Sequence, residues 1–384
     1  MRMVAIDRIR NWLVCWLGVS LLLSGCETAM PKPNLPPSES DFVFLKSSTI
    51  CTSKADFLKI YPISTLKVQA WGAGQEFVLS ADRSPSHGDE SYFFDEDGVL
   101  VGTLFTFSSG LDLKPYPVLR HTLTLLKPSL EFYLNVANLS SKTSMDSSSL
   151  YETGDAKSTT QYLVLSAREQ PVLLQASVTI DPYARLFSPY RREFLERLRY
   201  PNGQKSGQQV ESQGAEDKEL FFSLQQFARG QAAQLSYCGM QNYDAAVDAY
   251  QKANASGFTN KVWLAEAHHK LGLAWEGKGQ HEKAKTELIR SLSIRPNTPE
   301  ILNNLGMVYS KLGERGNALP LFEKAVILRP NYAIARYNLA EAIEQENPKR
   351  AIAEYETYLA LVEGLSDEAA RVTLVQQRIK ALKR

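Results

Sequence analysis

The sequence predicts an α+β domain followed by an all-α solenoid of helical repeats. Three features of the 384-residue chain lead to this fold class: an apolar run near the N-terminus, strand patterns in the first half, and one pattern written twice in the second half. The length allows two or three domains. A charged fraction of 22% and a hydrophobic fraction of 44% are typical of packed domains, and a net charge of +1 argues against nucleic acid as a partner.

Residues 1–25 have the pattern of a secretory signal peptide. Basic residues up to Arg10 precede an apolar run over residues 12–23, which is too short to cross a bilayer comfortably. The run ends in Leu-Ser-Gly before Cys26, which resembles the bacterial lipobox. The resemblance implies acylation of Cys26, with chains such as palmitate, and a lipid anchor. The alternative is an ordinary signal anchor with a chance cysteine. Because Glu27 rather than aspartate follows, we expect the periplasmic face of the outer membrane rather than the inner membrane.

A tether and a strand-rich domain are expected to follow. Residues 26–41 contain four prolines and predict a semi-rigid tether. Residues 42–200 are predicted to form the α+β domain. Two apolar runs at 92–94 and 99–107 flank an Asp-Gly turn, which predicts a β-hairpin.

A second hairpin is predicted over residues 162–165 and 172–180. In both cases the second strand leads to an aspartate and then to Pro-Tyr, and a helical pattern follows at 118–126 and 185–198. One interpretation is a tandem duplication of a helix-plus-hairpin unit; the other is that any two hairpins look alike. Residues 201–218, rich in glycine and glutamine, predict a flexible linker before the repeats.

The pattern over residues 265–332 is one unit written twice, first over 265–298 and again over 299–332. Gly272 and Gly306 are one matched pair. The other matched pairs are Trp275 and Tyr309, Ala284 and Ala318, Leu288 and Phe322, Ser291 and Ala325, and Pro296 and Pro330. A fixed period of this length predicts a solenoid of helix pairs. The matched residues resemble the tetratricopeptide repeat.

The spacing of residues within each unit agrees with this resemblance. Apolar residues recur at intervals of three and four positions, as in an amphipathic helix. Gly279 and Gly313 are expected to end the first helix, and Pro296 and Pro330 cannot extend the second. A degenerate upstream unit, with Gln234 in place of the glycine, and a downstream unit bring the total to about four over residues 219–365. Residues 366–384 are predicted to form a capping helix.

The sequence contains no catalytic or metal-binding signature. It lacks a Gly-rich phosphate loop, His-Glu-x-x-His and Cys-x-x-Cys, so we expect no enzyme activity, no cofactor and no metal. His268 and His269 are adjacent on a helix and therefore diverge by about 100°. Residues 87–90 and 95–98 are acidic, but they lack the ligand spacing of a Ca²⁺ loop, which favours solvated turns.

The resemblance implies a concave face, lined by the first helix of each pair, that binds a protein or peptide. The repeated asparagines on these helices are similar to the ladders with which some members of the family bind a peptide backbone, since an amide both donates and accepts. The alternative is that each Asn bonds within its own helix pair. The candidate binding residues are His269, Lys270, Asn303, Asn304, Met307, Tyr337, Asn338 and Glu341.

Cys51 and Cys238 could form a disulfide in an oxidising compartment. They fall in different predicted domains, and Cys238 falls on a predicted repeat helix. Two separate buried thiols are therefore the favoured interpretation, although pairing stays open.

Together these features predict a membrane-anchored periplasmic scaffold whose repeats bind a partner during assembly of an envelope or secretion complex. One alternative is an enzyme or small-ligand role for residues 42–200, with the repeats only structural. Another is a purely structural, self-assembling protein.

Overall fold

The structure, a computed structural model, describes residues 50–80, 89–112, 128–134, 146–154, 158–167, 170–187, 213–239, 241–255, 258 and 260–384. Residues 1–36 and 37–384 form two separate units, and all described residues belong to the second. The predicted signal peptide, Cys26 and the tether lie outside the described residues, as do the helical pattern at 118–126 and the linker over 201–212. Among the described helices, none combines the length and the apolar character needed to span a membrane.

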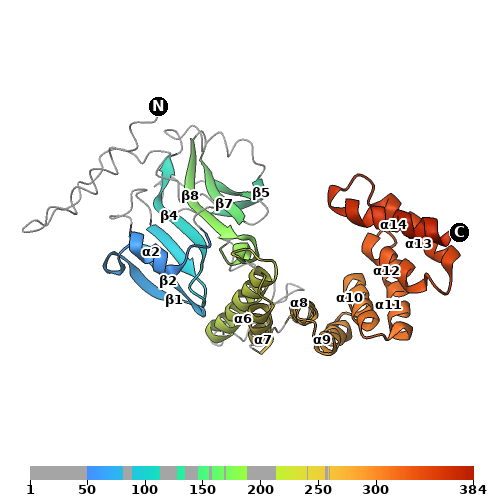
Figure 1. Cartoon of the computed structure of the whole chain (residues 1–384). Helices are drawn as coiled ribbons and strands as arrows, with labels where there is room; N and C mark the ends of the chain where they lie inside the picture. Colours follow the sequence, from blue (N-terminus) through green and yellow to red (C-terminus); the bar gives the residue numbers. More distant parts are fainter. Residues whose placement is uncertain are drawn as a thin grey trace, which may run out of the picture. The chain divides into compact units, whose positions relative to one another are not determined.

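The first half of the chain forms one antiparallel sheet of eight strands (Figure 1). The spatial order is β1-β2-β3-β4-β8-β7-β6-β5. The strands are β1 (Lys67–Trp71), β2 (Gly74–Leu79), β3 (Asp89–Phe94), β4 (Leu100–Asp112), β5 (Pro128–Leu134), β6 (Asp146–Gly154), β7 (Ser158–Ala167) and β8 (Gln170–Ile180).

Both predicted hairpins are present in this sheet. β3 pairs with β4 across the Asp-Gly turn, and β7 pairs with β8. Each half of the sheet is a meander of four consecutive strands, and the two halves meet where β4 pairs with β8, for example at Gly102 and Thr179. A tandem duplication would produce this strand order, because each half ends on the strand at the centre of the sheet.

A short helix, α2 (Lys54–Ile60), packs on the first half of the sheet. Its N-cap Ser53 accepts a hydrogen bond from the backbone N–H of Asp56 at 3.1 Å. Phe57 is buried, with its ring centroid 4.7 Å from that of Tyr92 and 5.2 Å from that of Phe94. These aromatic contacts hold α2 against the sheet. A 3-10 turn, η3 (Ile63–Thr65), leads from α2 into β1.

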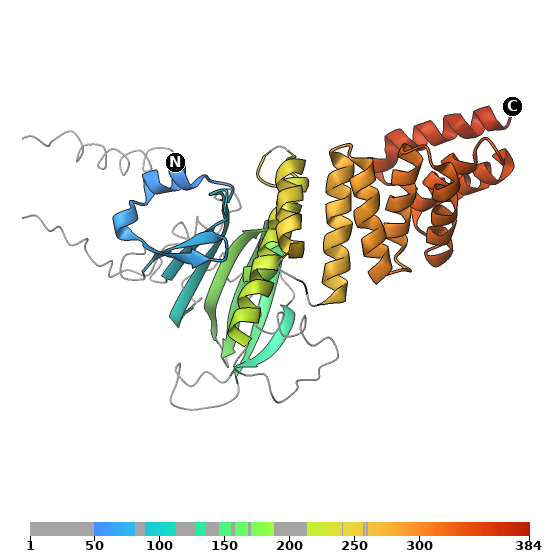
Figure 2. The same ribbon diagram turned by 90° about the horizontal axis from the view of Figure 1, so that it is seen from below.

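After β8 the chain continues through η4 (Asp181–Tyr183) and α4 (Ala184–Phe187), and the helical pairs then begin at residue 213. Consecutive helices from α7 onwards lie side by side (Figure 2). The helices are α6 (Gln213–Gln234), α7 (Tyr243–Ala255), α8 (Lys261–Gly277), α9 (His281–Ile294), α10 (Pro299–Lys311), α11 (Arg315–Leu328), α12 (Ala333–Ile343), α13 (Pro348–Leu361) and, after η5 (Ser366–Glu368), α14 (Ala369–Leu382).

Small residues allow the two helices of each repeat to approach closely. A Cβ atom at Gly306 would lie 2.6 Å from Cε1 of Phe322, and one at Gly272 would lie 2.8 Å from Cγ of Leu288. The predicted turns are also present, since Gly279 and Gly313 have φ of 72° and 77°.

The first helix pair differs from the prediction in its register. Gly230, not Gln234, takes the place of Gly272 and Gly306, because a Cβ atom at Gly230 would lie 2.6 Å from Cε1 of Tyr250. The connection from α6 to α7, residues 235–242, is longer than the connections that follow. Cys238 lies in this connection and not on a helix, which corrects the prediction.

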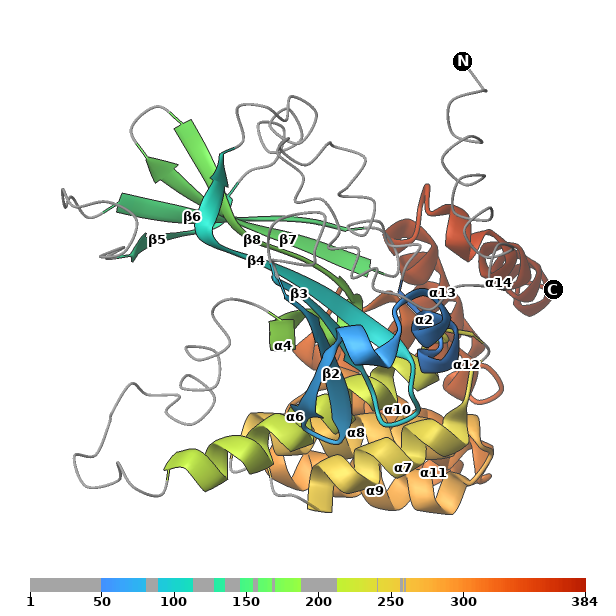
Figure 3. The same cartoon turned by 90° about the vertical axis from the view of Figure 1, so that its left-hand side faces the viewer.

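The sheet and the first helix pair share one hydrophobic core. Trp71 and Tyr183 of the sheet domain belong to the same buried cluster as Leu224 and Phe227 of α6, and the cluster continues into α8 and α10. α6 begins at Gln213, so the end of the predicted linker, 213–218, is helical. Figure 3 shows α6 and α7 beside the strands of the first half of the sheet.

Candidate functional site

The first helices of three successive repeats are connected by polar side chains. Asn338 of α12 donates a hydrogen bond from Nδ2 to Oδ1 of Asn303 on α10 at 2.8 Å. Asn303 in turn donates to Oδ1 of Asn304 at 3.4 Å, and Nδ2 of Asn304 lies 2.8 Å from Nε2 of His269 on α8. We call these four residues the amide ladder. Its bonds join neighbouring repeats rather than the two helices of one pair, which neither interpretation of the sequence anticipated.

The direction of the bonds in the amide ladder determines the tautomer of His269. Because Asn303 donates to Oδ1 of Asn304, Nδ2 of Asn304 is left to donate to Nε2 of His269, which must accept. The ring proton is therefore on Nδ1, which faces Oε2 of Glu266 at 3.7 Å. The nearby ring of His269, together with the charge of Lys270 at 3.5 Å, holds the pKa of Glu266 below its usual value despite its partial burial.

Burial separates the predicted binding residues into two groups. Asn303, Asn338 and His269 are 1%, 8% and 6% exposed, so their polar atoms are occupied by neighbouring helices. This corrects the expectation that these three side chains face a partner. Lys270, Asn304, Met307 and Tyr337 are half-buried and Glu341 is exposed.

Two of the remaining candidates contact the end of the chain. The ring of Tyr337 lies 5.7 Å from that of Tyr358 and 5.6 Å from the guanidinium of Arg371. Glu341 pairs with Arg378 of α14 at 2.9 Å. The C-terminal helices therefore already contact these side chains, which leaves Lys270, Asn304 and Met307 as the partly accessible candidates.

The two adjacent histidines contact different helices, as their divergence predicts. Nδ1 of His268 lies 2.7 Å from Oε2 of Glu287 on α9, within its own repeat, whereas His269 reaches α10. Among the described residues, no group of three His, Cys, Asp or Glu side chains is placed to hold a metal ion.

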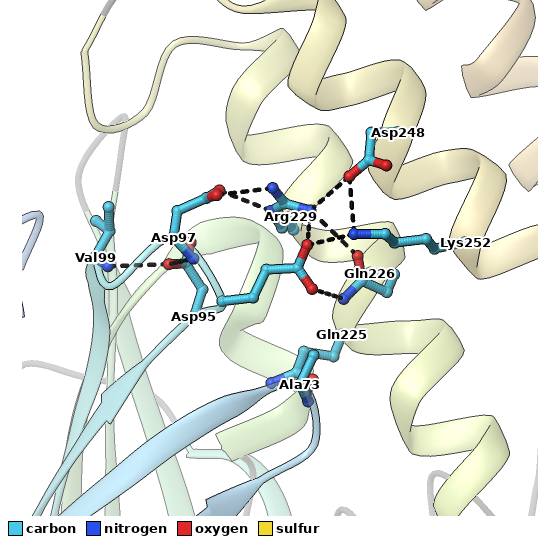
Figure 4. A network of polar contacts seen from close by, with 10 residues as sticks. Ala73, Asp95, Asp97, Val99, Gln225, Gln226, Arg229, Asp248 and Lys252 are labelled. Atoms are coloured by element: carbon cyan, nitrogen blue, oxygen red, sulfur yellow. Dashed lines mark hydrogen bonds and ion pairs between the residues drawn. The ribbon is translucent and has the colours of Figure 1, made fainter.

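A second polar cluster joins the sheet to α6 and was missed by the sequence analysis (Figure 4). Arg229 is 7% exposed and forms two hydrogen bonds to Asp97, at 2.8 and 2.9 Å, in the β3–β4 turn. It also pairs with Glu96 and, at 3.1 Å, with Asp248 of α7. Lys252 of α7 completes the cluster at 2.6 Å from Glu96. The acidic turn is therefore a contact between elements and not the solvated turn that its composition favoured.

The neighbouring β1–β2 turn is bound by a buried glutamine of α6. Gln225 accepts from the backbone N–H of Ala73 at 2.9 Å and donates to the carbonyl of Trp71 at 2.8 Å. Gly72 between them has φ of 60°, and a Cβ atom there would lie 2.1 Å from Oε1 of Gln225. Glycine adopts this backbone conformation without strain, and its lack of a side chain leaves room for Gln225.

A disulfide between Cys51 and Cys238 links the same parts of the chain, with Cα atoms 5.1 Å apart. The favoured interpretation of two separate thiols was therefore wrong. That interpretation placed Cys238 on a helix and the two cysteines in separate domains. Cys238 instead lies in the loop after α6, and the sheet packs against α6. Cys51 is also bonded to the start of β4 through its backbone N–H, which donates to the carbonyl of Leu100 at 2.8 Å.

A cavity of about 450 Å³ lies near the C-terminus, between α13 and α14. Its walls are mainly aliphatic and include Leu359, Val362, Leu365 and Val372. No titratable cluster of the kind that catalysis needs lines it, since Glu363 is the one ionisable residue among its described walls.

These observations define a helical-repeat protein of regularly spaced helix pairs, capped at one end by a β-sheet. Two tetratricopeptide-repeat family models match residues 265–298 and 299–332, which are α8–α9 and α10–α11. Residues 265–332 are therefore two tetratricopeptide repeats, a kind of repeat that serves as a protein-interaction scaffold.

Several solved structures are similar to the helical part. The Yersinia enterocolitica type III secretion translocator chaperone SycD is 15% identical, with 31% of this chain and 83% of SycD covered and a TM-score of 0.30. MamA is 21% identical, with 42% and 83% covered and a TM-score of 0.34. The first repeat domain of Spaghetti (RPAP3), bound to an HSP90 peptide, is 19% identical, with 30% and 93% covered and a TM-score of 0.27.

Proposed function

We propose that this protein is a membrane-anchored scaffold in the bacterial periplasm that binds a protein or peptide partner on the first helices of its repeats. Residues 265–332 are the part of the chain most directly assigned to such repeats. The single observation that carries the proposal is that Asn304 and Met307 are half-buried on a helix held on both sides by the amide ladder.

Rigidity is the physical basis of this role. A partner that binds a preorganised surface does not lose affinity to the ordering of loops or helices. The amide ladder holds α8, α10 and α12 in register, and α14 contacts α12 through the ion pair between Arg378 and Glu341. The partially exposed amide of Asn304 can then offer a hydrogen bond to an extended backbone, and Met307 can adapt to an apolar side chain.

The compartment is proposed from the N-terminal pattern and from the disulfide. Disulfides persist in oxidising compartments such as the bacterial periplasm. The Cys51–Cys238 bond therefore favours a location outside the cytoplasm. Acylation of Cys26 would hold the protein on the outer membrane, where anchoring concentrates the repeats at the surface.

Partner binding is tested by placing a photoreactive amino acid at position 304 in the full chain and identifying the crosslinked proteins in living cells. Thr286 of α9, which is exposed on a second helix, is the matched control position. We expect one recurrent protein partner from position 304 that is absent from position 286 and is lost when Met307→Glu is added. Equal crosslinking from both positions would contradict the proposal.

The anchor is tested independently by labelling cells with a clickable fatty acid and fractionating the membranes. We expect label on the full chain and none on Cys26→Ser, which should instead be recovered outside the outer-membrane fraction. Unlabelled wild-type protein would overturn the anchor and leave the partner-binding surface as a separate question.

A further inference from the structure

The amide ladder runs in one direction and ends on a histidine. Asn338 donates to Asn303 at 2.8 Å, and Asn303 donates to Asn304 at 3.4 Å. Asn304 in turn donates to Nε2 of His269 at 2.8 Å. Histidine is the side chain that ordinarily changes its charge between about pH 8 and pH 5. A neutral ring nitrogen accepts and a protonated one donates, so the direction of the ladder depends on whether Nε2 carries a proton.

A proton on Nε2 of His269 would reverse the amide ladder. The ring would then donate, so Asn304 would have to turn its amide by about 180° to present Oδ1 to the ring. The nitrogens of Asn304 and Asn303 would then face each other, so Asn303 would turn as well, and Asn338 after it. An amide that did not turn would leave a buried donor unpaired, whereas the full reversal re-forms three hydrogen bonds. The other contact that the reversal breaks is weak, because it joins Nδ2 of Asn303 to the sulfur of Met307 at 3.7 Å.

The surroundings of His269 support both forms of its ring. Without the proton on Nε2, Asn304 supplies the donor that this atom needs. With the proton, the carboxylate of Glu266, which lies 3.7 Å from Nδ1, stabilises the charged ring in its nearly buried position. The ring of His269 and the charge of Lys270 hold the pKa of Glu266 below its usual value, so this carboxylate stays ionised. Tyr250 of α7 stays neutral, because burial and the charge of Glu266 raise its pKa.

The charged groups that the other neighbouring helices bring to α8 belong to separate pairs. On α10, Lys311 pairs with Glu276, about two turns beyond His269 along α8. On α9, Glu287 lies 2.7 Å from Nδ1 of His268, which points away from the ladder. α12 contributes an uncharged amide to the ladder. The protonation of His269 is therefore coupled to the direction of the ladder more directly than to these pairs.

We propose that the amide ladder is a pH-sensitive switch, in which protonation of His269 at Nε2 turns all three amides and exchanges the donor and the acceptor that Asn304 presents to a partner. The effect on binding rests on the proposed function, whereas the reversal itself does not. Asn304 is half-buried, and its two bonds within the ladder leave one N–H and one oxygen lone pair for a partner. A partner that matches the neutral state meets like groups after the reversal, so acid weakens its binding by about fivefold to tenfold.

The reversal is tested by nuclear magnetic resonance on residues 37–384, the unit that contains the whole ladder, with nitrogen-15 in asparagine and histidine. The ring nitrogen shifts of His269 report which atom carries the proton, and the side-chain NH₂ signals of Asn303, Asn304 and Asn338 report their turning. We expect a proton on Nδ1 alone at pH 8. On titration to pH 5, the ring and all three amides should change with one common midpoint. The titration uses the unsubstituted sequence, so loss of folding in a variant cannot imitate the result.

His268→Gln is the matched control, because His268 is the adjacent histidine and bonds to Glu287 outside the ladder. This variant should leave the titration of the three amides unchanged. His269→Gln should abolish it, since a glutamine oxygen can accept but does not titrate. Three outcomes would overturn the switch: amide signals that do not follow the ring, a change at Asn304 alone, or a proton on Nε2 already at pH 8.

The effect on binding is measured separately, by crosslinking from a photoreactive amino acid at position 307 in permeabilised cells held at pH 7.5 or pH 5.5. We expect the yield of crosslinked partner to be about fivefold to tenfold lower at pH 5.5, and to be equal at both pH values when His269→Gln is added. Equal yields without that substitution would overturn the effect on binding. No crosslinked protein at either pH would contradict the proposed function, while the resonance titration still decides the switch.

Discussion

Asn338 and Asn303 connect the first helices of two neighbouring repeats through a hydrogen bond of 2.8 Å between buried amides. Asn338→Leu would leave Oδ1 of Asn303 buried without its donor, so we expect the free energy of unfolding to fall by about 1–3 kcal/mol. Urea denaturation of residues 37–384 measures the change. Adding Asn303→Leu should recover part of the loss, since neither amide is then unpaired. Asn317→Ala, on the exposed side of α11, is the control and should change stability by less than about 0.5 kcal/mol.

Arg229 is the central residue of the contact between the sheet and α6. Arg229→Met removes its bonds to Asp97, Glu96 and Asp248, which leaves Asp97 without this cation and Lys252 as the cation that pairs with Glu96 and Asp248. We expect a loss of about 2–3 kcal/mol, below the value for a fully buried pair because Asp97 and Asp248 are half-exposed.

Arg229→Lys should be intermediate, because lysine keeps the charge but cannot form the two parallel bonds to Asp97. Arg350→Met is the control, since the side chains of Arg350 and its partner Glu323 are 44% and 35% exposed. Equal losses for Arg229→Met and Arg350→Met would contradict the assigned role.

Cys51 and Cys238 are the two cysteines within residues 37–384. This unit, unfolded without reductant, should therefore react with no thiol reagent, and it should react with two equivalents after reduction. Cys51→Ser with Cys238→Ser should lower stability by about 2–5 kcal/mol, since the bond joins positions separated by 187 in the sequence. The detection of two thiols before reduction would show that the bond does not form.

Asp95 in the β3–β4 turn has a pKa raised from 3.8 to about 6, mainly by burial and further by the charge of Asp97. The folded state therefore prefers the protonated form, and this contribution to stability is present below pH 3.8 and is lost as the pH rises through 6. Asp95→Asn keeps the oxygen that accepts from the backbone N–H groups of Asp97 and Val99.

We expect Asp95→Asn to be more stable than the wild type by about 1–2 kcal/mol at pH 8, and the difference to disappear near pH 4. Thermal unfolding across this range is the measurement. Asp56→Asn is the control, because its hydrogen bond with Lys59 lowers the pKa of Asp56, so this variant should gain nothing at pH 8. A pH-independent effect of Asp95→Asn would contradict the argument.

Gly230 tests the register of the first helix pair. Gly230→Ala places a methyl group against the buried ring of Tyr250, and overpacking of this kind costs about 1–3 kcal/mol. Gly316→Ala, in a helix with no atom within 4 Å of the added Cβ, should be neutral or stabilising. If Gly230→Ala were as well tolerated as Gly316→Ala, the small-residue contact would be wrongly placed.

The middle repeats could be predicted closely because their signal is local and periodic. Gly272 with Leu288 and Gly306 with Phe322 are pairs with the same short separation in the chain, so one helix pair contains both members of each contact. The two hairpins were predictable for the same reason, since each turn lies between its own strands. In the first pair the connection is longer, so the spacing of the later repeats aligns Gln234, and not Gly230, with Gly272 and Gly306.

The candidate binding residues were placed on the correct helices, but their exposure was not predictable. Asn303 and Asn304 are adjacent, yet one is buried against α12 and the other is half-buried beside α8. Which of them is covered depends on the rotation of α10 against both neighbours, and a repeat pattern in one helix does not specify that rotation.

The sequence by itself determined the repeat period, the hairpins and the division into a strand-rich half and a helical half, because these depend on residues close together in the chain. Only the tertiary structure decided that Arg229 meets the β3–β4 turn, that Cys51 pairs with Cys238, and that amides join successive repeats. These contacts unite segments that are far apart in sequence, and they form because burial of the shared core brings the segments together. Composition and residue spacing alone do not predict contacts of this kind.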